Sequence, residues 1–341
     1  MGGDDPQATL GAVAYLQVVD LDTQARLDEL SDLFRSCRDS LHELSDSYHW
    51  KPASGSPASE DALALPSPDP RIRDPRGKTG HRMIADIVHS FLVMASGHLG
   101  GLAGLFSSAE VMLSPPILIR AVIENCAHAV WVLGDDPEEP ADHRLARAYL
   151  EELLSAEEEK KNAGRMLTKV HPTFMRAEAD YKALKAEILA RFAGATKADL
   201  GDKSLLNQEL PRLEDAVVWM YALTKKSGGT IGSEEAMGIY GFLSNMTHPT
   251  LYSARDKRLW GVEPFSGNRV AELRIEIDFL EKAARAALAA FYNALTYVNS
   301  YFGWPEDLLN DLEARIHAVI PDFFTDVSAR MPESSPTRSG E

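Results

Sequence analysis

Residues 115–133, PPILIRAVIENCAHAVWVL, decide the fold class of this chain. The two prolines suit the first turn of a helix, where a missing backbone N–H does no harm, and Ser114 before them is a predicted N-cap. Gly134 follows the apolar run and is expected to end the helix. Because apolar residues would cover almost every side of this helix, the segment is expected to lie at the centre of the protein.

Helical periodicity continues on both sides of this segment. Residues 79–106 are also apolar almost all round, with Thr79 as the predicted N-cap, and residues 100–104, GGLAG, lack the Lys and Ser/Thr of a phosphate-binding loop. No repeat, no stretch rich in β-formers and no strand–GxGxxG–helix unit is found. The sequence therefore predicts an all-α bundle of eight to nine helices, at about residues 16–50, 79–106, 115–133, 140–168, 174–193, 210–226, 233–248, 268–301 and 305–319.

The distribution of proline and serine suggests how the chain is organised. Residues 1–50 contain an N-terminal helix, and residues 51–78 form a linker rich in Pro, Ser and Asp without an apolar face. Residues 79–320 form the main bundle, in which 195–208 is a polar connector and 250–267 a loop. Residues 321–341 are predicted to be a disordered tail.

Composition excludes several classes of protein. The chain has 341 residues and a net charge of −16, and its basic residues are scattered, which disfavours a general nucleic-acid binder and leaves RNA as a disfavoured partner. It has no transmembrane run and no signal peptide, so we expect no membrane partner. The two cysteines, Cys37 and Cys126, form no CxxC motif, which excludes a disulfide scaffold and indicates a cytoplasmic protein.

One group of polar residues interrupts the apolar helix 115–133. Arg120, Glu124 and His128 are four residues apart and share one helix face. Buried ionisable groups need partners, because an unpaired buried charge is costly. Arg120 and His128 are candidate ligand-binding residues and Glu124 is a candidate acid/base. In the alternative interpretation Arg120 and Glu124 form an ordinary helical ion pair, and His128 bonds a backbone carbonyl.

A second group lies in residues 240–250, YGFLSNMTHPT. Tyr240, Ser244 and His248 repeat the four-residue spacing, and Pro249 is expected to end the helix at His248. The negative end of the helix dipole favours a protonated His248, so Tyr240 and His248 are candidate catalytic groups, and Ser244 and Asn245 candidate ligand-binding groups. The alternative is a helix end that is merely capped. A Ser–His hydrolase is disfavoured because no GxSxG elbow is present.

Metal-dependent chemistry receives little support. Glu124 and His128 lack the second E-x-x-H copy of a di-iron protein. Residues 135–139, DDPEE, resemble the aspartate-rich motif of terpene synthases, which implies Mg²⁺ and a diphosphate substrate, and Asn268, Glu272 and Glu276 match the second motif of those enzymes poorly. We therefore predict no metal and no cofactor.

The segments RAVIENCAHAVWVL and YGFLSNMTHPT resemble those of bacterial helical proteins that are distantly similar to the HEPN superfamily. The resemblance covers about residues 80–300 and implies a helical fold, a homodimer and metal-independent cleavage of RNA, as in a toxin or defence effector. HEPN ribonucleases use an R-x4–6-H motif, whereas seven residues separate Arg120 from His128.

These observations leave several functions open. The leading hypothesis is that helices 115–133 and 233–248 form a buried polar pocket that binds or transforms a small anionic or carbonyl-containing ligand. Arg120 and His248 would bind the ligand, while Glu124 and Tyr240 would orient it or move protons. The alternatives are a HEPN-like ribonuclease, a terpene-synthase-like enzyme and a non-catalytic interaction protein.

Overall fold

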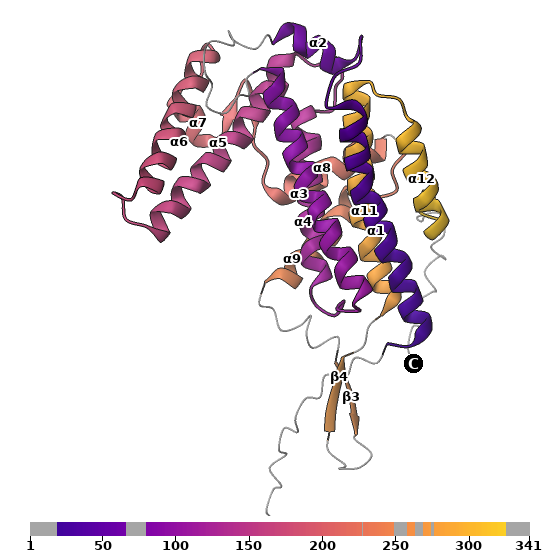
Figure 1. Cartoon of the computed structure of the whole chain (residues 1–341). Helices are drawn as coiled ribbons and strands as arrows, with labels where there is room; N and C mark the ends of the chain where they lie inside the picture. The colour runs from indigo at the N-terminus through magenta and orange to yellow at the C-terminus, as the bar shows by residue number, and fades with distance from the viewer. Residues whose placement is uncertain are drawn as a thin grey trace, which may run out of the picture.

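The computed structural model describes residues 19–65, 80–226, 228–248, 258–262, 269–273 and 276–324. Within them the chain is an all-α bundle (Figure 1), as predicted. Eleven helices occur in these ranges rather than eight or nine, because two short helices lie in segments that were predicted to be linkers. They are α1 (Leu21–Tyr48), α2 (Pro57–Ala64), α3 (His81–Ser107), α4 (Pro115–Leu133), α5 (Ala141–Met166), α6 (Pro172–Arg191), α7 (Lys197–Asp202), α8 (Leu213–Lys226), α9 (Ser233–Thr247), α11 (Ile277–Phe302) and α12 (Asp307–Val319).

Helix α4 lies at the centre of the bundle. Thirteen of its 19 residues are buried, and it packs against α3, α11, α8 and α9. α11 presents small side chains to the core, among them Ala284, Ala287 and Ala290, so that long helices can pack closely. The predicted central position of residues 115–133 is therefore confirmed.

The N-terminal helix is part of the same bundle. α1 packs against α3, α11 and α12, and Leu27, Leu30 and Phe34 are fully buried (Figure 1). The predicted linker between α1 and the bundle contains α2, whose N-cap is Ser56. Of the predicted caps, Thr79 lies outside the described residues, and α3 begins after Gly80.

Two predicted loop and helix assignments were wrong. Residues 268–301 do not form one helix, because Arg269–Leu273 is strand β4, which pairs antiparallel with β3 (Arg258–Val262). The polar connector holds α7 and a short hairpin of β1 (Ser204–Leu205) and β2 (Gln208–Glu209). A β-hairpin depends on pairing between strands, which the search for helical periodicity does not detect. Figure 1 shows the β3–β4 hairpin beyond one end of the bundle.

A buried ion pair attaches α2 to the bundle. Asp61 accepts two hydrogen bonds from Arg144 of α5, at 2.7 and 2.9 Å, and a third from the Tyr301 hydroxyl of α11, at 2.7 Å. All three side chains are buried. Burial alone would lower the pKa of Arg144, but its bonds to Asp61 outweigh that effect and raise it. A short, polar helix such as α2 cannot bury enough apolar surface to hold itself in place, so this contact fixes it.

We expect Asp61→Asn to destabilise the protein by about 3 kcal/mol, because it leaves the Arg144 guanidinium buried without its counter-ion. Urea unfolding followed by circular dichroism measures this change. Asp32→Asn is the matched control, since Asp32 is exposed and pairs with Arg35 on the surface of α1. Equal stability of the Asp61 and Asp32 variants would contradict the assignment of the buried pair.

Candidate functional site

The two predicted polar groups meet between α4 and α9. Arg120 of α4 donates from Nε to Glu124 Oε1 at 2.7 Å, and from Nη2 to the Tyr240 hydroxyl of α9 at 2.9 Å. Its Nη1 donates to Thr247 Oγ1 at 2.7 Å and, at 3.4 Å, to Ser244 Oγ. The two helices that were expected to form the walls of a polar pocket thus meet directly through these side chains. We call Arg120, Glu124, Tyr240, Ser244 and Thr247 the α4–α9 cluster.

The hydrogen bonds of the α4–α9 cluster form a closed set. The Tyr240 hydroxyl accepts from Arg120 and donates to Glu124 Oε1 at 3.0 Å, while Thr247 donates to the Ser244 carbonyl at 2.7 Å. The Arg120 guanidinium also lies over the Tyr240 ring, 5.0 Å from its centroid. Most donors of Arg120 are therefore used inside the protein.

The charges in the cluster stabilise one another. The side chains of Arg120 and Glu124 are 17% and 19% exposed. Burial lowers the pKa of Arg120, and its bonds to Glu124 more than compensate, so the net change is upward. Burial and the neighbouring Glu124 raise the pKa of Tyr240 to about 12. Tyr240 is thus a protonated donor at neutral pH, which suits it to orienting Glu124 rather than accepting a proton.

The three other predicted residues have different surroundings. His128 is buried and its Nδ1 contacts Glu151 of α5. It therefore does not join the cluster, although it shares a helix face with Arg120. His248 is the C-cap of α9, as predicted, and it is exposed. Asn245 is partly buried on α9. The catalytic roles of Glu124, Tyr240 and His248, and the ligand-binding roles of the others, stay predictions.

The DDPEE segment lies in the loop between α4 and α5. Asp136 accepts a hydrogen bond from the Glu138 backbone at 2.9 Å, and Glu139 pairs with Arg147. Its carboxylates are therefore divided between a turn and an ion pair. Of the partner motif, Asn268 lies outside the described residues and Glu276 is exposed. Across the ranges that the structure describes, no cluster of three His, Cys, Asp or Glu could hold a metal ion.

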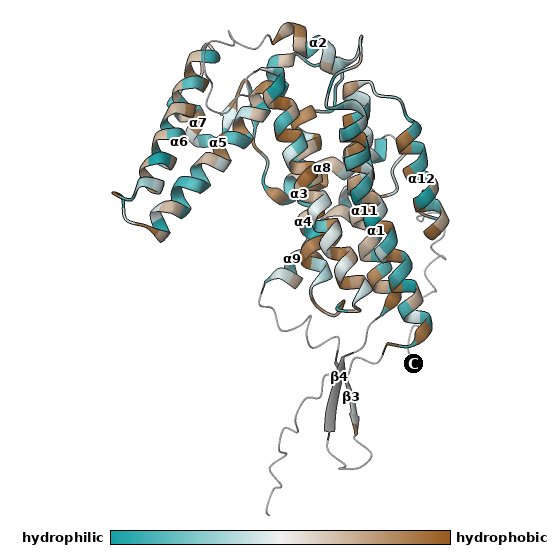
Figure 2. Cartoon of the chain, viewed as in Figure 1, coloured by the Kyte–Doolittle hydropathy of each residue, from teal (hydrophilic) through white to brown (hydrophobic). Residues whose placement is uncertain are grey.

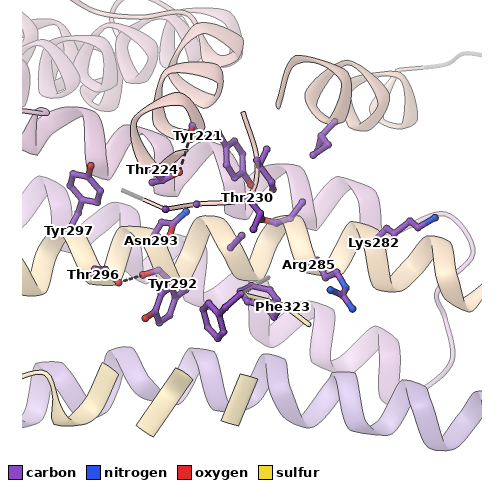
Figure 3. A pocket seen from close by; sticks show the side chains of 17 residues that line it. Tyr221, Thr224, Thr230, Lys282, Arg285, Tyr292, Asn293, Thr296, Tyr297 and Phe323 are labelled. Carbon is purple, nitrogen blue, oxygen red and sulfur yellow. Dashed lines mark hydrogen bonds between the residues drawn. The ribbon is translucent and has the colours of Figure 1, made fainter. Parts of the chain in front are cut away.

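A pocket of about 420 Å³ is lined by α8, residues 228–231, Ile239 of α9, α11 and residues 323–324 (Figure 3). Ile239 of α9 lines it, next in sequence to Tyr240 of the α4–α9 cluster. α9 therefore contacts α4 with one face and forms a wall of the pocket with another. The sequence analysis did not find this pocket, because its walls come from segments up to about a hundred residues apart.

Helix α11 places basic residues at one end of the pocket and uncharged residues along the rest of it. Eight of its residues line the pocket, at spacings of one, three and four, between Lys282 and Tyr297. Figure 3 shows Lys282 and Arg285 at one end, Asn293 further along, and Tyr297 at the other end. The wall between them contains the small side chains Ala286 and Ala289. This stripe of polar and small residues was the available signal in the sequence.

Basic residues but no acidic residues line the pocket, although the chain as a whole is acidic. Its 17 lining residues include Lys282 and Arg285 and no Asp or Glu. Arg285 donates from Nη2 to Glu281 and Asp322, at 2.9 and 2.6 Å, and within the described ranges its Nε and Nη1 have no hydrogen-bond partner. Lys282 forms no ion pair with any described residue. These donors are therefore available to an anionic group.

Five aromatic residues contribute to the rest of the pocket. Tyr221, Tyr292, Tyr297, Phe323 and Phe324 line it. The Tyr221 hydroxyl is turned to the Ala286 carbonyl at 2.7 Å, and the Tyr292 hydroxyl to Glu313 at 3.1 Å. Both rings thus present apolar surface to the pocket while their hydroxyls are satisfied elsewhere.

No family model matches the chain, and no curated protein or solved structure shows significant similarity to it. The HEPN resemblance is neither supported nor excluded by these comparisons. By length and composition α3 and α4 could each cross a membrane, a property that core helices of soluble proteins share.

We expect Arg120→Met to destabilise the protein by about 2–3 kcal/mol, because it leaves Glu124 partly buried and removes the bonds to α9. Tyr240→Phe, which removes only the hydroxyl, should cost about 1 kcal/mol. Urea unfolding checks both. Arg35→Met is the control, since Arg35 makes only a surface pair with Asp32. Equal free energies of unfolding for Arg120→Met and Arg35→Met would show that the cluster does not stabilise the packing of α9 against α4.

Proposed function

We propose that this protein binds a small elongated anion with an apolar body, and that the binding site is the pocket between α8, α9 and α11. The observation that carries the proposal is the pocket's charge. In a chain with 51 acidic and 35 basic residues, a pocket lined by two basic residues and no acidic one favours an anion.

The size and shape of the pocket support a ligand of this kind. A volume of about 420 Å³ lies within the range of small-molecule sites. From Lys282 to Tyr297, α11 rises by roughly 22 Å, at about 1.5 Å per residue. An elongated ligand would place its anionic group, such as a carboxylate, sulfonate or phosphate, near Lys282 and Arg285. Its apolar body would then lie along Ala286, Ala289 and the aromatic rings.

The α4–α9 cluster has a positioning role in this proposal. It supplies no group to the lining, and Arg120 is already occupied by four protein partners. Its role is to hold α9, and with it Ile239, against the pocket. The sequence suggested an anionic or carbonyl-containing ligand at Arg120, whereas the anion proposed here binds in a separate pocket that Ile239 of α9 lines.

Anilinonaphthalene sulfonate is a suitable probe, because it combines aromatic rings with one sulfonate and fluoresces when it binds an apolar site. We expect Lys282→Gln to weaken its binding about five- to tenfold, which corresponds to about 1–1.4 kcal/mol. The uncharged analogue N-phenylnaphthylamine should bind the Lys282 variant as well as it binds the unaltered protein. Lys182→Gln on α6 is the control, since Lys182 is exposed and remote from the pocket.

Ala289→Trp tests the location independently, because the indole would fill the middle of the pocket. We expect both probes to lose binding in this variant, and circular dichroism to show that it remains folded. If both probes bound the folded Ala289 variant with unchanged affinity, the pocket would not be their site and the proposal would be wrong.

A further inference from the structure

Helix α3 exposes an uncharged face. Ser90, Val93, Met94, Gly97, Gly101 and Gly104 are exposed and follow one side of the helix, and we call them the α3 face. Val93 and Met94 are 43% and 46% exposed. From residue 90 to residue 109 the chain contains no Asp, Glu, Lys or Arg. Figure 2 shows hydrophobic residues along α3, in contrast to the hydrophilic surface of α5 and α6.

The glycines make the α3 face open to close contact. A Cβ added at Gly97 or Gly104 would meet no atom within 4 Å. At Gly101 an added Cβ would lie 3.1 Å from Leu118 Cδ1, which places the start of α4 beside the face. Ile117, in the same turn of α4, is exposed and extends the apolar surface. Another helix could therefore approach the backbone of α3 closely, as small residues permit.

The pattern of the α3 face is complementary to itself. If two copies of α3 cross antiparallel with Gly97 on the two-fold axis, Val93 of each copy lies opposite Gly101 of the other. Ser90 then lies opposite Gly104. A two-fold contact requires such reciprocal pairs, in which each large side chain meets a small one.

The charges at the two ends of α3 fit the same arrangement. Arg82 is exposed in the first turn, and Glu110 is exposed just beyond the last. In the antiparallel crossing, Arg82 of each copy falls at the α3–α4 turn of the other, which carries Glu110. Asp86, one turn from Arg82, already interacts within its own chain. The contact thus has a neutral centre with opposite charges at its ends, although each chain carries −16 overall.

We propose that the α3 face is the contact between two copies of this chain in a two-fold symmetric dimer. A membrane is the other surface that an exposed apolar helix could meet. Interfacial helices have a fringe of Lys and Arg that binds anionic headgroups, whereas the α3 face has none between residues 90 and 109. The negative charge of the whole chain would also oppose binding to an anionic bilayer.

Sedimentation equilibrium of the full chain tests this proposal. We expect a dimer, and we expect Gly97→Glu to weaken dimerisation at least a hundredfold, because two carboxylates would meet on the axis. Gly201→Glu is the matched control, since Gly201 is an exposed helical glycine of α7 whose added Cβ would meet nothing within 4 Å. Circular dichroism should show both variants folded, because each substitution points into open space.

A charge reversal tests the antiparallel arrangement. Arg82→Glu alone and Glu110→Arg alone should each weaken the dimer about tenfold, and the double variant should restore it. A monomer at every concentration, or a dimer that Gly97→Glu leaves intact, would overturn the proposal. Co-sedimentation of a monomeric protein with phosphatidylserine vesicles, lost in Gly97→Glu, would overturn it in favour of a membrane contact.

Discussion

The hydrogen bonds that Arg120 makes to α9 are the constraint on which the rest of the candidate site depends. Of the 15 residues of α9, Ala236, Tyr240 and Leu243 are buried, and Ile239 and Phe242 are partly buried against the core. Arg120 reaches it from the central helix with three hydroxyl contacts, and Glu124 holds the guanidinium in position. A residue that looked like a ligand anchor in the sequence is thus bonded to a neighbouring helix in the structure.

This attachment links the two sides of α9. Tyr240 faces Arg120, and the preceding residue, Ile239, lines the pocket. Neighbouring helical residues point about 100° apart, so Tyr240 can contact α4 while Ile239 lines the pocket. Because both residues belong to α9, any displacement of α9 from α4 also displaces Ile239. Polar contacts between α4 and α9 thus position Ile239 at the pocket. The lining itself offers apolar surface, Lys282 and Arg285 to a ligand.

The sequence predicted those features that depend on local periodicity. The apolar residues of α3 and α4 identified the central helices, and the four-residue spacing of Arg120, Glu124, Tyr240 and Ser244 identified the polar residues that meet. It failed where distant residues decide the structure. α2 is a helix whose Asp61 is bound by Arg144 and Tyr301, and the β3–β4 hairpin depends on pairing such as Trp260 with Ala271.

The direction of a side chain was also beyond the sequence. His128 shares a helix stripe with Glu124, yet its partner is Glu151 of α5 and not a residue of the α4–α9 cluster. The pocket was missed for a related reason. Its lining on α11 combines basic, polar, small and aromatic residues, which form a pocket only when α8, residues 228–231, Ile239 and residues 323–324 close around them.

The affinity of Arg120→Met for anilinonaphthalene sulfonate tests the central claim most directly, because Arg120 is absent from the pocket lining. The account predicts that this variant, at a urea concentration and temperature where it is fully folded, binds the probe several-fold more weakly. It also predicts faster amide hydrogen exchange in α9 than in α11. Unchanged affinity, with α9 exchanging as slowly as in the unaltered protein, would show that Arg120 does not position the pocket wall.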